Sequence, residues 1–352
     1  MRTGRGTTSE TAVAMVVTEP GGPLRPTPAA TVSPTGTWVR VSVTASGVCH
    51  ADLGTAAATG AGTSFPVTPG HEVAGVIAET GDRVEGWAVG DRVAVGWFGG
   101  SCGHCAFCRA GDVVHCPGRK VPGLSYPGGW ARSITVPADA LARIPDGLDP
   151  FDAAPFGCAG VTTFNAVRGA GVRAGGRVAV FGLGGLGHLA VQFAARLGYE
   201  TVAVGRGSDR EELARALGAH HYLDSEAHAP GAALKDLGGA DLIVHTASST
   251  APVADLLTGL RVHGRLTLVG VDAGSVTVPA ARLVMNGHTV TGRLTGSPRE
   301  TEEAMRFAVV NGVRPMIERM PLERAGEALT RLRSGAPRFR IVLDPADGAA
   351  SA

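Results

Sequence analysis

The sequence has little net charge, because 32 Lys and Arg residues nearly balance 31 Asp and Glu residues and leave a formal charge of +1 at pH 7. A protein that binds nucleic acid by its phosphates needs a basic field, and a charged interaction arm needs a run of one sign. Neither is present. The charge pattern therefore predicts no nucleic acid partner.

Long apolar runs are also missing. The first run, Ala12 to Val17, has six residues between two threonines, which is too short for the core of a signal peptide. No run approaches the roughly 20 apolar residues of a membrane span. We expect a cytoplasmic chain without a membrane segment, with frayed ends over residues 1–10 and from about Pro345.

The length and composition are those of a compact globular protein with more than one core. The 352 residues exceed the roughly 250–300 at which a single hydrophobic core stops growing, so two domains are expected. Hydrophobic residues make up 44% of the chain and charged residues 18%. The 52 glycines are a surplus, and glycine costs backbone entropy unless a turn or a close approach requires it.

Four of the six cysteines lie in the segment CGHCAFCRAGDVVHC, as Cys102, Cys105, Cys108 and Cys116. Reduced thiols two residues apart can reach one tetrahedral ion, so the segment predicts a structural zinc site. An iron–sulfur cluster is the alternative, because a proline follows Cys116. The ferredoxin run, however, needs three residues before its last cysteine, and this segment has seven.

The other two cysteines are Cys49, in GVCHADLG, and Cys158, and a His71-Glu72 pair lies between them in TPGHEVAG. A zinc site that performs chemistry keeps three protein ligands and one open position, and Cys, His, Cys is one such set. Each residue alone has an ordinary explanation, since a lone cysteine is usually a small buried apolar group. Together they leave no cysteine unassigned.

The segment RVAVFGLGGLGHLAVQFAARLG, from Arg177, predicts a strand, a glycine-rich turn and a helix. Its glycines would let the backbone approach a pyrophosphate at the helix N-terminus. Expected cofactor contacts in this turn are Gly182, Gly184, Gly185, Leu186 and Gly187.

The alternation of strands and helices continues after this turn. Strands are expected at 201–204, 241–246 and 265–271, and helices at about 211–217 and 253–260. This pattern predicts an α/β fold with a doubly wound parallel sheet. The last strand is expected to add Val269 and Val271 to the cofactor contacts.

The end of the second strand predicts which dinucleotide binds. An acidic residue about 20 positions beyond the first glycines normally holds the ribose hydroxyls of NAD. Gly205 stands there instead, followed by Arg206, Ser208 and Arg210. Because a guanidinium can bind a 2′-phosphate with two hydrogen bonds, we expect NADP(H). The alternative is that both arginines are ordinary solvated charges.

With these residues considered, the chain resembles the zinc-dependent alcohol dehydrogenases of the medium-chain dehydrogenase/reductase superfamily, in its cinnamyl and yeast-type branch. The resemblance runs from about Ala14 to Asp344 and is carried by SGVCHADL, TPGHEVAGVIAETGDRV, VGDRVAV, the four-cysteine segment, CAGVTTFNA, FGLGGLGHLAVQFA and RFRIVLD. It implies a GroES-like β-barrel catalytic domain of residues 11–160 and 295–344, with a zinc lobe at 102–116. It also implies a Rossmann domain of residues 161–294 and a homodimer or homotetramer.

The resemblance also implies roles for individual residues. Cys49, His71 and Cys158 would hold a catalytic zinc, with Glu72 as a possible transient ligand and Asp52 orienting His71. The remaining implied positions are the four cysteines of the lobe on a structural zinc, Arg340 and His50 near the pyrophosphate, and Trp97, Phe98 and Phe156 along the substrate pocket. Each of these three aromatic residues could equally be an ordinary core residue.

The implied reaction is reversible hydride transfer between an alcohol carbon and the nicotinamide, assisted by zinc. The family passes the alcohol proton through a Ser or Thr and a His, but Ala51 and Gly54 stand at those positions. We therefore expect a reductase of an aldehyde, ketone or conjugated acceptor. The alternatives are reduction of an activated C=C or C=N bond, a zinc-free quinone reductase, and a non-catalytic nucleotide- or zinc-binding protein. The small residues between Leu53 and Phe65 do not identify the substrate.

Overall fold

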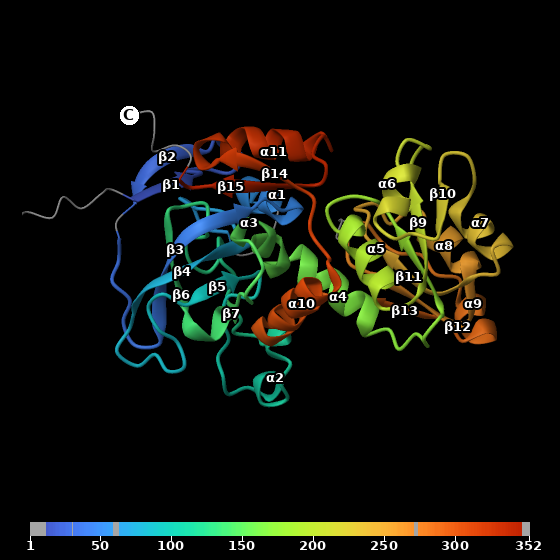
Figure 1. The fold of residues 1–352 in the computed structure, drawn as a ribbon, viewed down its shortest axis with the longest axis horizontal. Helices are drawn as coiled ribbons and strands as arrows, with labels where there is room; N and C mark the ends of the chain where they lie inside the picture. The colour runs from blue at the N-terminus through green and yellow to red at the C-terminus, as the bar shows by residue number, and fades with distance from the viewer. Residues whose placement is uncertain (1–11, 30, 59–62, 271–273, 347–352) are drawn as a thin grey trace, which may run out of the picture.

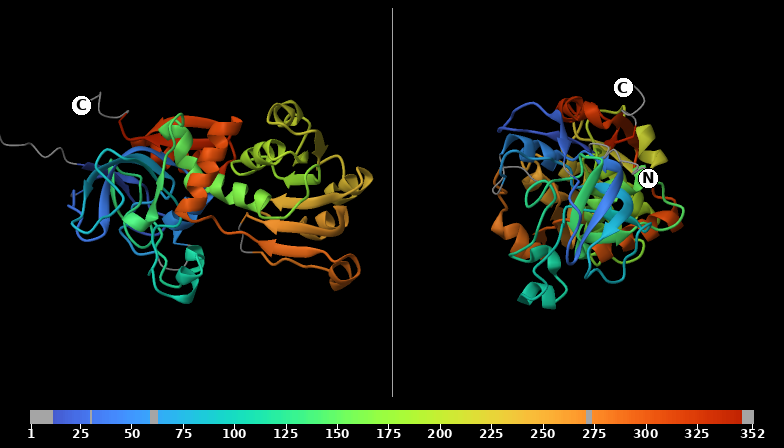
Figure 2. Two further views of the ribbon diagram at one scale, coloured as in Figure 1. Left: turned by 60° about the horizontal axis from the view of Figure 1, so that its bottom comes forward. Right: turned by 90° about the vertical axis from the view of Figure 1, so that its left-hand side faces the viewer.

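The computed structural model describes residues 12–29, 31–58, 63–270 and 274–346. Two lobes lie side by side along the long axis of the molecule, each built on its own sheet (Figure 1). One lobe contains both ends of the described chain, and the other contains its middle, as the turned views also show (Figure 2).

The middle lobe is built on a six-stranded sheet in which every paired strand is parallel. Its strands are β8 (Arg177–Phe181), β9 (Glu200–Gly205), β10 (His221–Asp224), β11 (Ala240–His245), β12 (Leu260–Leu268) and β13 (Thr289–Gly292). The order β10-β9-β8-β11-β12-β13 is the 3-2-1-4-5-6 order of the Rossmann fold. Strand order reverses beside β8, so ligands are expected at the carboxyl ends of β8 and β11.

Helices connect these strands. They are α4 (Ala159–Arg168), α5 (Gly187–Arg196), α6 (Glu211–Ala216), α7 (Pro230–Asp236), α8 (Val253–Leu256) and α9 (Ala280–Asn286). The apolar residues after the glycine-rich turn explain α5, because Leu189, Val191 and Phe193 are all buried under the sheet or the neighbouring helices. The predicted doubly wound α/β sheet is thus present.

Two boundaries in this lobe differ from the sequence-based expectation. The helix expected to reach Leu260 ends at Leu256 and is followed by a short 3₁₀ turn, Leu257–Gly259. Strand β12 then begins at Leu260, earlier than expected, because Leu260 pairs with Ala240 before a register shift. It ends at Leu268, so Val269 follows the strand, and Val271 lies outside the described residues.

The other lobe is built on a seven-stranded mixed sheet of order β14-β15-β3-β4-β5-β7, with β6 added to β3. Its strands are β3 (Trp38–Gly47), β4 (Val73–Thr80), β5 (Arg92–Val95), β6 (Ser133–Pro137), β7 (Leu141–Arg143), β14 (Ile317–Pro321) and β15 (Arg340–Asp344). Strands β1 (Ala12–Val16) and β2 (Arg25–Ala29) form a separate hairpin. The antiparallel pairing of β15 with β3 joins residues from opposite ends of the chain.

The helices of this lobe are α1 (His50–Ala57), α2 (Ala106–Arg109), α3 (Pro150–Ala153), α10 (Pro298–Asn311) and α11 (Ala325–Arg333). Its two halves in sequence meet the middle lobe through one apolar cluster. In that cluster Phe156 packs edge-on to Phe193 with ring centroids 6.4 Å apart, and Met305 is fully buried beside them. Phe156 is therefore a core residue, whereas the sequence left pocket and core open. Phe98 is also buried, and only Trp97 of the three is partly exposed.

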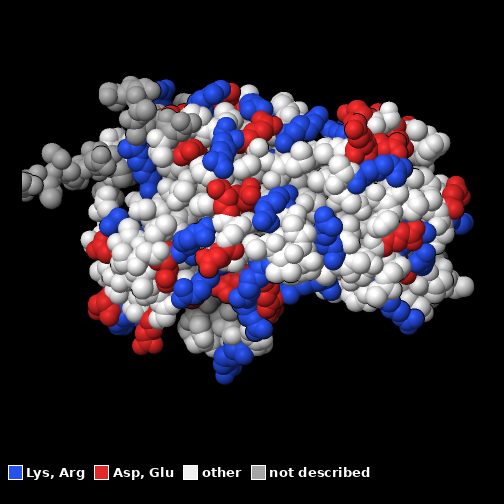
Figure 3. Space-filling model, in the orientation of Figure 1, with Lys and Arg blue, Asp and Glu red and all other residues white. Residues whose placement is uncertain are grey.

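The surface agrees with the near-zero net charge. On the face shown in Figure 3, acidic and basic side chains are interspersed over both lobes. Within the described residues, no helix combines the length and apolar character that crossing a bilayer requires.

Candidate functional site

Three chain turns bring the predicted metal ligands together. Strand β3 ends at Gly47, and Cys49 then caps the N-terminus of α1. The Asp52 carboxylate accepts a hydrogen bond from the Cys49 backbone N–H at 2.9 Å, which holds the first turn of the helix. His71 and Glu72 directly precede β4, and the Gly47 N–H donates to the Glu72 carbonyl oxygen at 2.7 Å.

Cys158 reaches the same place from the N-terminus of α4. One ligand atom from each of Cys49, His71, Glu72 and Cys158 lies within 4.8 Å of all the others. The two sulfurs are 4.0 Å apart. All four residues are buried or nearly so, and a buried cluster of two thiols and an imidazole is the donor set of a tetrahedral zinc site with one open position.

The surroundings of the two ring nitrogens of His71 indicate whether a metal ion fits this cluster. Its Nδ1 lies 3.1 Å from Asp52 Oδ1, so the carboxylate sets the tautomer and leaves Nε2 facing the thiols. That Nε2 is buried and has no hydrogen-bond partner among the described residues. Buried polar atoms are normally satisfied, so an unpartnered imidazole nitrogen beside two sulfurs fits a metal ligand.

The protonation of the cluster follows from its own contacts. The hydrogen bond from Cys158 lowers the pKa of Cys49 well below the ordinary thiol value, against the opposing effect of burial. The same contact with Cys49, together with burial, raises the pKa of Cys158 well above that value. Burial lowers the pKa of His71, but the Asp52 carboxylate and Cys49 together outweigh it, and the net shift is upward.

Glu72 is held by a residue from the far end of the chain. Both carboxylate oxygens accept from Arg340 Nη2 at 2.5 Å, and both side chains are buried. Burial raises the pKa of Glu72 to about 7 although Arg340 opposes this. A Cβ at Gly47 would lie 2.1 Å from Glu72 Oε2, so only glycine leaves room for this carboxylate.

Arg340 also borders the predicted dinucleotide turn, because its Nη1 lies 2.9 Å from the position of a Cβ on Gly185. It therefore connects the thiol cluster with the glycine-rich turn. His50 is the exposed first residue of α1. Ala51 is exposed and carries no group that could move a proton.

The four lobe cysteines form a second cluster. Their sulfurs lie within 4.8 Å of one another, with Cys105 and Cys108 3.5 Å apart. Hydrogen bonds from the backbone N–H groups of His104 and Cys105 lower the pKa of Cys102 to about 6. A group of four converging thiols, one already disposed to ionise, fits a single tetrahedral structural zinc.

The glycine-rich turn is closed tightly before α5. A Cβ on Gly187 would lie 1.8 Å from the Gly182 carbonyl oxygen, and Gly182 has a φ of +97°. A Cβ on Gly184 would meet nothing within 4 Å, so the turn is open to the outside at that residue. A backbone exposed in this way at a helix N-terminus can cradle a pyrophosphate.

Sequence reasoning missed His188, the first residue after these glycines. His188 is buried, its Nδ1 donates to the Gly184 carbonyl oxygen at 2.9 Å, and its Nε2 accepts from the Met316 N–H at 3.1 Å. Its ring stacks on Phe339 with centroids 5.0 Å apart. Burial lowers the pKa of His188 to about 4, so the imidazole is neutral and links the glycine-rich turn to the other lobe. A polar residue at the start of an otherwise apolar helix was the available signal.

At the end of β9 the two predicted arginines differ. Arg210 Nη1 donates to the Leu183 carbonyl oxygen at 3.0 Å, so Arg210 supports the glycine-rich turn. Arg206 is exposed and has no side-chain hydrogen bond or ion pair within the part of the chain that the structure describes. Ser208 is exposed as well. Of the two guanidinium groups, Arg206 is therefore the one available to a ligand.

A cavity of about 460 Å³ lies between the cysteine lobe and the carboxyl ends of β12 and β13. Val269 and Gly270, which follow β12, and Leu294, which follows β13, line one side of it, and His115 lines it from the cysteine lobe. Its lining includes the segment that returns the chain from β13 to α10. Sequence reasoning missed both His115, which directly precedes Cys116 in the four-cysteine segment, and Leu294, which belongs to no motif.

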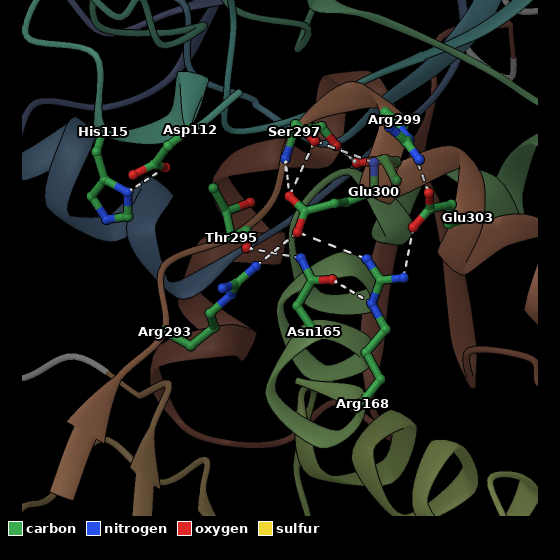
Figure 4. A network of polar contacts seen from close by, with 11 residues as sticks. Asp112, His115, Asn165, Arg168, Arg293, Thr295, Ser297, Arg299, Glu300 and Glu303 are labelled. Carbon is green, nitrogen blue, oxygen red and sulfur yellow. Dashed lines mark hydrogen bonds and ion pairs between the residues drawn. The ribbon is translucent and has the colours of Figure 1, made fainter. Parts of the chain in front are cut away.

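A polar network holds this returning segment (Figure 4). Glu300 accepts from Arg293 Nη2 at 2.8 Å and from the Ser297 N–H at 2.8 Å. Asn165 Nδ2, on α4, donates to the Thr295 carbonyl oxygen at 3.4 Å. Thr295 has a φ of +22°, which is unusual for a β-branched residue, and such strain persists only where neighbouring contacts impose it.

Two family models match the chain: the alcohol dehydrogenase GroES-like domain at residues 35–146 and the zinc-binding dehydrogenase domain at residues 185–309. An alcohol dehydrogenase of Aspergillus sp. is 39% identical over 328 residues, covering 93% of this chain and 96% of that protein. An NADP-dependent alcohol dehydrogenase of Mycolicibacterium smegmatis is 36% identical over 309 residues, covering 85% and 88%.

Solved structures agree. A cinnamyl alcohol dehydrogenase from Sorghum bicolor superposes with a TM-score of 0.88 at 30% identity, covering 95% of this chain and 98% of that one. A Helicobacter pylori protein of the same description, solved as a complex with NADP(H), gives a TM-score of 0.86 at 26% identity, covering 95% and 97%.

Proposed function

Since the chain belongs to the zinc-binding alcohol dehydrogenases of the medium-chain dehydrogenase/reductase superfamily, we propose that it transfers a hydride between NADP(H) and an alcohol or carbonyl carbon, chiefly as a reductase. The observation that carries this proposal is the buried His71, whose Nε2 has no partner among the described residues and faces the sulfurs of Cys49 and Cys158. A site with three protein ligands of this kind binds a metal ion and leaves one coordination position open.

Each metal would be held by its own set of residues. Cys49, His71 and Cys158 would hold the catalytic zinc, and the four lobe cysteines a structural one. When bound at the first site, zinc supplies a Lewis acid for the substrate oxygen. Asp52 accepts a hydrogen bond from the Nδ1–H of His71 and so keeps Nε2 free as a ligand. The buried Arg340 balances the charge of Glu72, the possible transient ligand.

The cofactor would bind at the carboxyl ends of the parallel strands, with its pyrophosphate beside β8 and its adenosine ribose beside β9. The turn from Gly182 to Gly187 offers backbone N–H groups to a pyrophosphate, and Arg340 borders it at Gly185. Gly205 brings no carboxylate to the second strand end, and Arg206 offers a free cation beside it. These features favour the 2′-phosphate of NADP(H).

The direction of the reaction is inferred from the missing proton relay. Neither Ala51 nor Gly54 has a group that exchanges a proton, and a positioned acid or base typically contributes about 10²- to 10⁴-fold in rate. Of the two titratable neighbours of Ala51 in sequence, Asp52 is buried against His71, and His50 lies exposed at the start of α1. With the proton drawn from water or a ribose hydroxyl, reduction of an aldehyde, ketone or conjugated acceptor is favoured over oxidation of simple alcohols.

Steady-state kinetics with NADPH and NADH tests the proposal. We expect kcat/KM to favour NADPH by at least about tenfold, equivalent to ~1.4 kcal/mol. Arg206→Ala should remove most of this preference. Arg173→Ala is the matched control, because Arg173 is exposed and precedes the amino end of β8, whereas Arg206 follows the carboxyl end of β9. Equal efficiency with both cofactors in the unmodified enzyme would contradict the assignment and leave Arg206 as a solvated charge.

The substrate side is tested with a panel of aldehydes, ketones, enals and cyclic imines, followed by product analysis. Alcohols formed from carbonyl substrates support the proposed reaction. Saturated carbonyl products from enals, or amines from imines, would instead support the alternative, reduction of an activated C=C or C=N bond. Light scattering on the same preparation tests the predicted dimer or tetramer.

A further inference from the structure

The surroundings of Gly205 leave no space for a side chain at this position. Its backbone is not in the left-handed region, so its conformation is open to any residue. A Cβ at this position, however, would lie 2.5 Å from Tyr222 Oη and 3.2 Å from two atoms of the Tyr222 ring. The phenol of Tyr222 therefore fills the volume into which a side chain at 205 would project.

Tyr222 comes from the neighbouring strand β10, where it pairs in register with Ala203 of β9. Its hydroxyl donates to the Gly207 carbonyl oxygen at 2.6 Å. Burial, and then the nearby Asp224, raise the pKa of Tyr222, so the phenol stays protonated and keeps donating.

The same strand holds the other side of the Gly207 peptide group. The Gly207 N–H donates to Asp224 Oδ1 at 2.8 Å. Gly207 has a φ of +74°, which a glycine adopts readily. Strand β10 thus fixes both polar atoms of the residue between Arg206 and Ser208, the two exposed side chains expected to meet the cofactor.

We propose that Tyr222 is a specificity-determining residue for the nucleotide. This inference rests on the proposed NADP(H)-dependent function and adds a second residue to it. The phenol excludes an acidic side chain at 205, the group that would hold the ribose hydroxyls of NAD. It also positions the loop that carries Arg206. The preference for one cofactor is then a property of the Gly205–Tyr222 pair. An acidic side chain at 205 can hold the ribose hydroxyls of NAD only when Tyr222 is replaced by a smaller residue.

The cofactor experiment compares the unmodified enzyme with Gly205→Asp, Tyr222→Ala and the double variant. We expect Gly205→Asp alone to lower kcat/KM for NADPH by at least about tenfold without a gain for NADH, because the two side chains collide. The double variant should use NADH at least about tenfold better than Tyr222→Ala does. If Gly205→Asp alone raises kcat/KM for NADH as much as the double variant does, Tyr222 does not control which cofactor is used.

The conservative variant Tyr222→Phe separates positioning from packing. It keeps the ring that packs against the buried cluster containing Ala203 and Ala214 but loses the hydrogen bond to the Gly207 carbonyl oxygen. We expect KM for NADPH to rise several-fold while kcat stays unchanged and KM for NADH is unaffected. An unchanged KM for NADPH would show that the hydroxyl does not position the loop.

Thermal melting without cofactor gives a readout independent of which nucleotide is used. Gly205→Ala adds only the Cβ, so it should lower Tm in the unmodified background and leave it unchanged beside Tyr222→Ala. Equal shifts in both backgrounds would overturn the inference. An enzyme that prefers NADH yet shows this coupling would refute the proposed cofactor and leave the steric role of Tyr222 intact.

Discussion

His188 makes the stability of this protein depend on pH. The imidazole is buried between the two lobes, with Nδ1 donating to Gly184 and Nε2 accepting from Met316. Protonation would turn Nε2 into a donor facing another N–H group, so the folded state resists it. Burial, and then the positive charge of Arg340, lower the pKa of His188 from its ordinary value of 6.5 to about 4.

The sign and size of this pH dependence follow from the number of protons that the folded and unfolded chains bind. Between pH 6.5 and pH 4 the unfolded chain binds more protons at this residue than the folded chain, so unfolding is favoured as the pH falls. The contribution of neutral His188 is complete above pH 6.5 and is lost as the pH drops toward 4. At 1.36 kcal/mol per pKa unit, the full effect is roughly 3 kcal/mol, of which about 2 kcal/mol is lost between pH 7.5 and pH 5.

The assay is equilibrium urea unfolding with zinc present, at pH 7.5 and pH 5, on the unmodified protein and on His188→Gln. Other groups titrate equally in both, so the difference between the two pH dependences isolates His188. We expect the free energy of unfolding of the variant to fall by about 2 kcal/mol less over this interval. His228→Gln, which removes an exposed histidine, is the control and should behave as the unmodified protein. Parallel pH dependences for all three proteins would refute the reasoning.

Three further predictions concern the metal sites and the proton. Cys105→Ser and Cys158→Ser should each reduce bound zinc from two ions per chain to one. Only Cys105→Ser should also lower folding yield and Tm, because structural zinc sites supply folding free energy. Full activity in folded, metal-free enzyme would contradict this prediction. Asp52→Asn should weaken zinc binding by about 10- to 100-fold in a chelator competition, and an unchanged affinity would mean that the bond to His71 does not tune the ligand. Ala51→Thr should raise kcat for benzyl alcohol oxidation more than for benzaldehyde reduction by restoring a hydroxyl; equal rates in both directions, unaltered by the substitution, would remove the basis for the reductive assignment.

Sequence reasoning worked best where the chemistry is local. The four lobe cysteines lie within fifteen residues, so their spacing alone predicts convergence on one ion. The glycine-rich turn is equally compact, and its strand and helix form where expected. The alternation of elements was enough to predict a parallel doubly wound sheet, because strands that alternate regularly with helices are typical of a parallel sheet. The matches to two family models, together spanning most of the chain, confirm the family inferred from these motifs.

The boundaries near Leu260 and the roles of single side chains could not be obtained in the same way. The predicted helix end was wrong because the register of Leu260 on Ala240 starts the strand early, and periodicity does not contain that pairing. Arg206 and Arg210 look alike in sequence, but only the fold brings Arg210 to the Leu183 carbonyl oxygen. His188 carried no motif, and its role depends on Met316 in the other lobe.

The sequence by itself determined which groups this protein has: two thiol sets, an imidazole with its carboxylate, and a backbone turn fit for a pyrophosphate. The tertiary structure alone decided other contacts. Glu72 and Arg340 are 268 residues apart, His188 meets Met316 in the other lobe, and Tyr222 faces Gly205 from another strand. Contacts of this kind depend on strand order and on the packing of two lobes, which are properties of the whole chain and leave no local pattern.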